Sequence, residues 1–172
     1  GMRWGLIPNW ATAADSKYST FNARAETIDS KPAFKHAWSH SRRCLLPARG
    51  YYEWHLEEGA KQPYFVSLPP EIPMTMAGLF EPARGTEIPA SCAILTCAAS
   101  GPLALLHNRM PVMLPISMAG EWFSASPQQA LAMLGAGQDL PLTFYPVSKR
   151  VNNARNDDAE LIDPITRTAA ML

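Results

Sequence analysis

The sequence predicts an α+β domain built on a mainly antiparallel, barrel-like sheet with a few flanking helices. Its 172 residues include 16 prolines and 10 glycines, so the regular elements must be short and separated by many turns. The apolar fraction of 47% is typical of a globular chain. A chain of this length fits one domain with a sizeable core. We therefore expect residues 1–172 to form a single domain in which strands outnumber helices.

The strand candidates are recognised by apolar runs bounded by turn residues. Residues 4–8 indicate a short strand that ends at Pro8, and residues 43–55 a longer strand interrupted at Pro47 and Gly50. Residues 57–60 predict a hairpin turn, followed by a return strand that begins after Pro63. Further strands are expected over residues 74–80, 90–97 and 142–145.

Two short helices are predicted from their end signals. Ser30 is expected to be the N-cap of the first, with Pro32 in its first turn and an end near His40. The Ser126-Pro127 pair opens the second helix, which Gly135 closes. Both helices are short enough to flank the sheet rather than form a layer of their own.

Charge and cysteine content exclude several classes of protein. Fifteen Lys and Arg balance 15 Asp and Glu, so no net charge attracts nucleic acid, although a local basic patch is not excluded. The odd number of cysteines, Cys44, Cys92 and Cys97, with no paired spacing argues against a disulfide framework, and no CxxC pair indicates a zinc clamp, so reduced structural thiols are favoured. No apolar run approaches a membrane span and no secretory signal opens the chain, so the expected location is the cytoplasm.

Four clusters combine polar residues with glycine, proline or aromatic residues in ways that a core does not require. They are residues 4–10, 22–27, 43–54 and 107–112. Each therefore supplies candidates for chemistry or binding.

Glu53 and His107 are the candidates for proton transfer. Glu53 stands between Tyr52 and Trp54, where a carboxyl group is partly desolvated and suited to acid–base work. The alternative is a strand residue that faces solvent between two core aromatics. His107 follows an apolar run and is either a general acid or base or a hydrogen-bonded structural histidine.

Asn22, Arg24 and Arg109 are the candidates for ligand binding. Asn22 and Arg24 share one face of an extended segment, and an amide beside a guanidinium suits a phosphate or a sugar. The alternative is an Asx-turn with a salt bridge to Glu26. Arg109 either binds an anion in a bidentate manner or forms a surface ion pair.

His36 and His40 have the i,i+4 spacing of a metal-binding helix. No adjacent glutamate completes a zinc motif and no third ligand is evident, so a solvated helix face is the favoured interpretation. The sequence thus predicts neither a metal site nor a cofactor.

Taken together and in order, the clusters resemble the SOS response-associated peptidase (SRAP) family. The resembling residues are 4–8 (WGLIP), 22–27 (NARAET), 50–54 (GYYEW), 107–112 (HNRMPV), 145–148 (YPVS) and 151–153 (VNN). Any one motif is weak, but their order along nearly the whole chain is specific. The resemblance implies a single α+β domain that recognises abasic sites in single-stranded DNA, without a cofactor, a membrane or an obligate protein partner.

The resemblance also implies roles for individual residues. Glu53 would assist opening of the deoxyribose ring, His107 would exchange a proton, and Asn22 would orient the sugar or the N-terminal residue. Arg24 and Arg109, together with Lys31, would hold flanking phosphates, and Trp54 would stack on a base. The protein would be cytoplasmic, and associated with the nucleoid when bound to DNA.

The family's nucleophile is an N-terminal cysteine, whose amine and thiol close a thiazolidine ring on the abasic aldehyde. The family begins with Met-Cys-Gly-Arg, upstream of the WGLIP motif. Here that motif begins at Trp4, so we expect a domain that is truncated at its N-terminus. Two other functions remain open: a single-stranded DNA-binding module without chemistry, and a peptidase or hydrolase that uses Glu53 and His107.

Overall fold

A computed structural model describes residues 1–14, 19–135 and 139–165. Its strands are β1 (Arg3–Trp4), β2 (Asn22–Arg24), β3 (Arg43–Ala48), β4 (Tyr51–Glu57), β5 (Ala60–Ser67), β6 (Met74–Glu81), β7 (Ser91–Ala98), β8 (Arg109–Pro111) and β9 (Thr143–Pro146). Its α-helices are α1 (Lys35–Ser39), α2 (Ala119–Ser124) and α3 (Pro127–Met133). The 3-10 turns are η1 (Ala25–Thr27), η2 (Gly101–Leu105), η3 (Ile116–Met118), η4 (Lys149–Asn152) and η5 (Ala159–Ile162).

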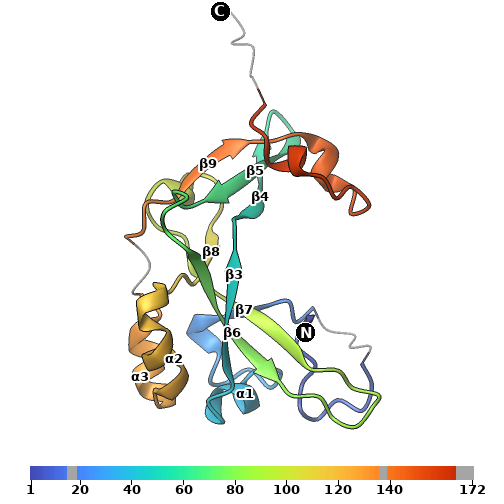
Figure 1. Cartoon of the computed structure of the whole chain (residues 1–172), viewed down its shortest axis with the longest axis vertical. Helices are drawn as coiled ribbons and strands as arrows, with labels where there is room; N and C mark the ends of the chain where they lie inside the picture. The colour runs from blue at the N-terminus through green and yellow to red at the C-terminus, as the bar shows by residue number, and fades with distance from the viewer. Residues whose placement is uncertain (15–18, 136–138, 166–172) are drawn as a thin grey trace, which may run out of the picture.

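The strands form two sheets, shown one above the other in Figure 1. The lower, six-stranded sheet has the order β1-β7-β6-β3, with β2 and β8 also paired to β7. The upper sheet has the order β4-β5-β9. All strand pairs are antiparallel except β1 and β2, which run parallel to β7. The α+β class and the mainly antiparallel, curled sheet that the sequence predicted are confirmed.

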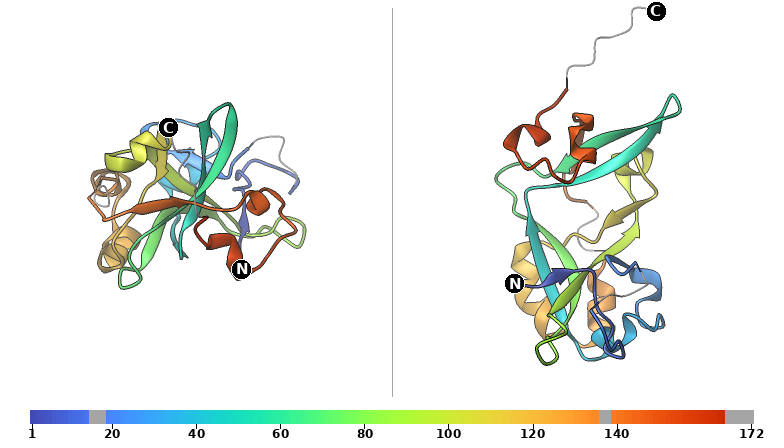
Figure 2. Two further views of the ribbon diagram at one scale, coloured as in Figure 1. Left: turned by 90° about the horizontal axis from the view of Figure 1, so that it is seen from above. Right: turned by 90° about the vertical axis from the view of Figure 1, so that its right-hand side faces the viewer.

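The helices cover the lower part of the molecule, where α2 and α3 lie side by side (Figures 1 and 2). Trp38 of α1 and Trp122 of α2 are buried in the main hydrophobic cluster, together with Leu79 and Leu95 of the sheet. This core fixes β6 and β7, which pair with each other. β2 and β8 both pair with β7. The rigid part of the fold therefore supports the segments that carry the candidate site.

The predicted strand over residues 43–55 is two strands in different sheets. β3 pairs with β6 and β4 pairs with β5, and the break falls at Arg49 and Gly50. Pro47 does not interrupt β3, contrary to the prediction, because β3 is an edge strand and a proline there deprives no neighbour of a hydrogen bond.

The hairpin between β4 and β5 confirms the predicted turn. Glu58 and Gly59 have φ values of 48° and 80°, as a two-residue turn that follows the strand twist requires. The return strand begins at Ala60 rather than after Pro63. β9 pairs with β5 only from Tyr64 onward, so Pro63 lies where β5 has one ladder partner and a missing N–H is tolerated.

The ends of the helices show which local signals were decisive. Ser126 caps α3 as predicted, because its side chain accepts from the Gln129 N–H while the Gln129 side chain accepts from the Ser126 N–H. Ser30 is not an N-cap: its hydroxyl donates backward to the Thr27 carbonyl at 3.1 Å. The first helix therefore begins only at Lys35.

Arg43 is buried where β3 meets the helices. Its guanidinium donates to the carbonyl oxygens of Trp122 and Ala125 at 3.1 and 2.6 Å and lies 5.3 and 5.4 Å from the ring centroids of Trp38 and Trp122. Burial lowers the pKa of this guanidinium. The side chain thus closes the C-terminal end of α2, whose last carbonyls have no partner within the helix.

We expect Arg43→Met to lower the free energy of unfolding by about 2–4 kcal/mol, because it leaves these carbonyl groups buried and removes the cation–π contacts. Urea denaturation measures the change. Arg155→Met is the control, since Arg155 is exposed and its loss should change stability by about 0.5 kcal/mol or less. Equal stability of the two variants would show that Arg43 does not hold the helix end.

No helix in the described ranges combines the length and apolar character needed to cross a membrane.

Candidate functional site

A cavity of about 180 Å³ lies where the two sheets meet. The three-stranded sheet contributes Tyr52 and Glu53, and the six-stranded sheet and its connections contribute Trp4, Asn22, Thr96 and His107. The site is thus assembled from segments that are far apart in the sequence.

Glu53 lies on β4 with its side chain about three-quarters buried. One carboxylate oxygen accepts a hydrogen bond from the Trp54 backbone N–H at 3.1 Å. The other lies 3.7 Å from Nδ1 of His107. The two residues singled out for proton transfer are therefore neighbours in the wall of the cavity.

His107 follows η2 and is held at its Nδ1 atom. The Arg109 backbone N–H donates to Nδ1 at 3.1 Å, and the Arg109 carbonyl oxygen lies 3.0 Å from the same atom. In the neutral ring, this donor places the proton on Nε2. A second proton on Nδ1 would face the Arg109 carbonyl and the Glu53 carboxylate.

A second histidine of the site, His55, connects the strand of Glu53 to the turn before His107. His55 stands two residues after Glu53 on β4, so the two side chains share a face. Its Nδ1 lies 2.9 Å from the Leu106 carbonyl oxygen. This hydrogen bond attaches the end of η2 to β4, and the sequence pattern gave no signal for it.

Asn22 and Arg24 lie on β2, which runs alongside β7. Ala23 between them is buried, so both polar side chains lie on the opposite face, as the period-2 spacing predicted. Asn22 lines the cavity. Arg24 is exposed, pairs in register with Thr96 of the cavity wall, and forms no hydrogen bond or ion pair with any residue in the described ranges.

Arg109 lines the same cavity, but protein groups occupy its guanidinium. It donates to both carboxylate oxygens of Glu26 at 2.6 and 3.0 Å and to the Thr96 carbonyl at 2.6 Å. Hydrogen bonding to Arg109 lowers the pKa of the Glu26 carboxyl. Glu26 thus pairs with Arg109. The alternative interpretation, in which Glu26 forms a salt bridge with Arg24, is wrong. This pair ties β8 to η1.

Trp54 and Lys31, also expected at the DNA interface, are not among the residues that line the cavity. The indole N–H of Trp54 donates to the Asn152 side chain at 2.8 Å, and its ring centroid lies 6.5 Å from that of Tyr52. Trp54 therefore borders the site beside a residue of the cavity wall. Lys31 is exposed in the turn before α1.

Trp4 is the functional candidate that sequence reasoning missed. It lines the cavity although 53% of its surface is exposed. Its ring packs edge-on against Phe21 at 5.3 Å, and Phe21 is itself 46% exposed. Large exposed aromatic pairs beside a polar cavity suit base stacking. The signal was in the sequence, in the first motif, but nothing there distinguished Trp4 from a core residue.

Comparison with known proteins decides the family. The family model described as "SOS response associated peptidase (SRAP)" matches residues 1–154. This chain belongs to the SRAP family. The resemblance predicted from the sequence motifs is thereby confirmed.

Two curated relatives of this SRAP domain have names that state a function. Abasic site processing protein HMCES from Gallus gallus is 34% identical over 192 residues, which cover 95% of this chain and 56% of the chicken protein. Abasic site processing protein YoaM from Bacillus subtilis is 36% identical over 169 residues, which cover 94% of this chain and 74% of YoaM. The SRAP domain described here thus spans little more than half of the HMCES length.

Solved structures share the SRAP fold. A protein from Bacteroides thetaiotaomicron superposes with a TM-score of 0.80 at 24% identity, over 96% of this chain and 76% of that one. A protein from Bordetella bronchiseptica superposes with a TM-score of 0.75 at 30% identity, over 86% of this chain and 76% of that one.

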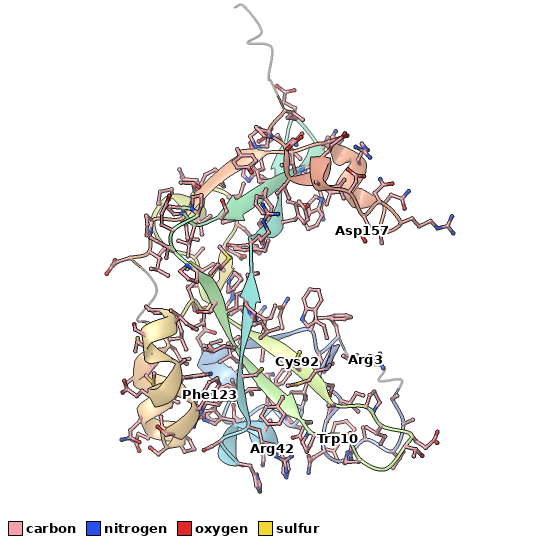
Figure 3. The ribbon with its side chains drawn as sticks, viewed as in Figure 1. Arg3, Trp10, Arg42, Cys92, Phe123 and Asp157 are labelled. Atoms are coloured by element: carbon pink, nitrogen blue, oxygen red, sulfur yellow. The ribbon has the colours of Figure 1, made fainter. Side chains whose placement is uncertain are left out.

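The cysteines of this SRAP domain are poor nucleophiles. Burial raises the pKa of the Cys44 thiol to about 12, with a smaller effect of Cys92, and burial also raises the pKa of Cys92 and Cys97. Cys92 lies on β7 among the side chains of the lower sheet (Figure 3). Because the thiolate is the reactive form, a raised pKa makes these thiols weaker nucleophiles than an ordinary cysteine.

The two helical histidines contact protein groups. His36 Nδ1 lies 2.9 Å from the carboxylate of buried Glu81, which Arg42 also binds. His40 Nδ1 lies 2.9 Å from the His36 carbonyl oxygen. Within the described ranges, no group of three or more His, Cys, Asp and Glu side chains is arranged to hold a metal ion.

Proposed function

We propose that this SRAP domain binds abasic sites in single-stranded DNA and catalyses opening of the abasic sugar ring. The observation that carries the proposal is the Glu53–His107 pair, 3.7 Å apart, facing Asn22 across a cavity of about 180 Å³. Arg24 lies exposed next to this cavity, as a group that binds a flanking phosphate would. The function implies that the protein acts where DNA is, in association with the nucleoid.

The size of the cavity favours a sugar without its base. Sites for drug-sized ligands usually measure about 300–1,000 Å³, and this cavity is smaller. A space of this size matches a deoxyribose better than a complete nucleotide. Exclusion of the base would provide selectivity for abasic sites without any group that recognises damage directly.

The proposed chemistry is proton transfer at the closed hemiacetal of the abasic sugar. Glu53 removes the proton of the C1′ hydroxyl while protonated His107 gives a proton to the ring oxygen. The bond from C1′ to the ring oxygen breaks and the C1′ carbonyl forms, so the products are the aldehyde and a free 4′ hydroxyl. The Asn22 amide lines the same cavity and orients the sugar against these two neighbouring groups.

We propose that the aldehyde then reacts with the cysteine that the family carries at its N-terminus, which is not among residues 1–172. The α-amine adds to C1′, water leaves to give an imine, and the thiol adds to the imine carbon to close a thiazolidine. The buried thiols of Cys44, Cys92 and Cys97 have no α-amine and cannot form this ring.

A binding and crosslinking assay tests the function. We expect the 172-residue chain to bind an abasic single strand more tightly than an intact strand or a duplex, and to yield no stable adduct on a denaturing gel without reductant. A form that begins with the family's processed N-terminal cysteine should yield the adduct. Equal affinity for abasic and intact strands would contradict abasic-site recognition, and a stable adduct of the shorter chain would contradict the assigned nucleophile.

Salt dependence tests the phosphate contacts. Because Glu26 already occupies Arg109, Arg24 and Lys31 remain to neutralise phosphates, and log affinity should fall against log salt with a slope of about −1.4, at about −0.7 per contact. Arg24→Ala should make the slope shallower by about 0.7. Lys61→Ala, an exposed lysine next to the β4–β5 turn, is the control and should leave the slope unchanged. A slope that is the same in all three proteins would exclude Arg24 from the interface.

A further inference from the structure

A second and larger cavity, of about 540 Å³, adjoins the end of β3. Phe65 of β5 and Tyr145 of β9 form one wall, as cross-strand neighbours with ring centroids 5.9 Å apart. Pro69, Pro70 and Pro73 of the β5–β6 connection form another. Because proline fixes the backbone, this wall is already shaped before a ligand arrives. The volume lies within the usual range for a small-molecule site.

The polar side chains that line this cavity are few, and Arg49 is the charged one among them. Arg49 lines it, is exposed, and forms no hydrogen bond or ion pair with any residue in the described part of the chain. Ser67 and Thr143 contribute hydroxyl groups from neighbouring strands. The Tyr145 hydroxyl donates to the Ile162 carbonyl at 2.9 Å, which fixes its ring. An aromatic wall, hydroxyl groups and an unpaired guanidinium match a base with an adjoining phosphate.

The linings of the two cavities share one strand, β6. Met74 lines the larger cavity and Met76 the smaller one, and residues two apart on a strand point to the same face. Arg49 precedes Glu53 by four residues on the chain that leads from β3 to β4, which limits their separation to about 13 Å. Tyr52 of the smaller cavity packs on Phe65 of the larger one, with ring centroids 5.5 Å apart.

We propose that the larger cavity binds the base of a nucleotide flanking the abasic site on the same DNA strand, with Arg49 on its phosphate. The inference rests on the proposed function, because the occupant belongs to the strand whose abasic sugar lies at Glu53. It assigns each cavity by size: the smaller one takes a sugar without a base, and the larger one takes a complete nucleotide. Binding of the flanking base in the larger cavity would thus position the neighbouring abasic sugar in the smaller one.

The test uses the 172-residue chain, an abasic thymidine oligonucleotide, and fluorescence anisotropy at about 0.15 M salt. Arg49→Glu should weaken binding at least fourfold. One phosphate contact contributes a slope of about −0.7 in log affinity against log salt, which amounts to about fourfold between 1 M and 0.15 M salt. Thr143→Trp, which places a large ring at the cavity wall, should weaken binding to a similar or greater extent. Lys61→Glu is the control for charge, because Lys61 is exposed and lines neither cavity.

Strand trimming identifies the occupant. Two shortened oligonucleotides end at the abasic residue, one without its 5′ neighbours and one without its 3′ neighbours. We expect the Arg49→Glu effect to vanish with one of them and to persist with the other. Thymidine monophosphate alone should bind at least 100-fold more weakly than the strand, because it lacks the linkage to the abasic sugar.

Several results would overturn the proposal. If Arg49→Glu binds no more weakly than Lys61→Glu, or if its effect persists with both shortened strands, the cavity does not hold a flanking nucleotide. Tight binding of the free monophosphate, with an Arg49 variant that binds the strand normally, would assign the cavity to a free nucleotide. If the unmodified chain prefers abasic strands and only the Arg49 result fails, the proposed function stands alone. If the unmodified chain binds no single strand, both proposals fail.

Discussion

Glu53→Gln is expected to slow opening of the bound abasic sugar by about 100-fold, the lower end of what general acid–base catalysis contributes. Glutamine keeps the shape of the side chain and can still accept the hydrogen bond from the Trp54 N–H, but it cannot take a proton from the C1′ hydroxyl. The affinity for abasic DNA should change much less than the rate, because the substitution removes proton transfer and leaves the cavity intact.

The rate can be measured without an N-terminal cysteine on the protein. Free cysteine added to the complex traps the aldehyde as a thiazolidine with loss of water, and its appearance on the oligonucleotide is followed by mass spectrometry. Glu121→Gln on the exposed surface of α2 is the matched control and should react like the unmodified chain. An unchanged rate for Glu53→Gln with normal DNA binding would favour a binding module without chemistry.

Gly50→Ala is expected to lower the free energy of unfolding by about 3 kcal/mol, the upper end of the usual cost of overpacking. A Cβ atom at Gly50 would lie within 3.0 Å of the Phe65 ring and of the Val66 carbonyl oxygen. The ring is buried and the oxygen belongs to the backbone of β5, so neither can move aside readily. For a chain of this length, such a loss lowers the Tm by about 10 °C.

Gly120→Ala is the matched control for this experiment. A Cβ atom at Gly120 meets no heavy atom within 4 Å, and alanine favours the helix α2 more than glycine does. We expect a change of about 1 kcal/mol or less, toward greater stability. Differential scanning calorimetry measures the Tm of Gly50→Ala, of Gly120→Ala and of the unmodified chain. A Tm of Gly50→Ala equal to that of the unmodified chain would show that β3 and β4 do not need this close approach to β5.

The sequence by itself determined the features that depend on neighbouring residues. The Glu58-Gly59 turn and the Ser126 cap are set by local backbone and side-chain hydrogen bonds, and both are where the sequence predicted them. The family could be recognised for a related reason, because its motifs are contiguous and their order survives without knowledge of the fold. The alternation in β2 likewise predicted that Asn22 and Arg24 share a face.

Only the tertiary structure decided which of these segments meet. The sequence predicted the interruption at Gly50, but not that the two halves belong to different sheets, β3 with β6 and β4 with β5, which packs closely against Gly50. That division turns β4 away from β3 and brings Glu53 within 3.7 Å of His107.

The charged partners were also a matter of tertiary structure. Arg24 stands two residues before Glu26 in the same motif, yet Glu26 pairs with Arg109 from a distant motif and leaves Arg24 exposed. Sequence periodicity states which face a residue occupies, whereas its partner depends on strands that pair across long loops. Those pairings are fixed by the burial of the whole sheet, to which every distant segment contributes.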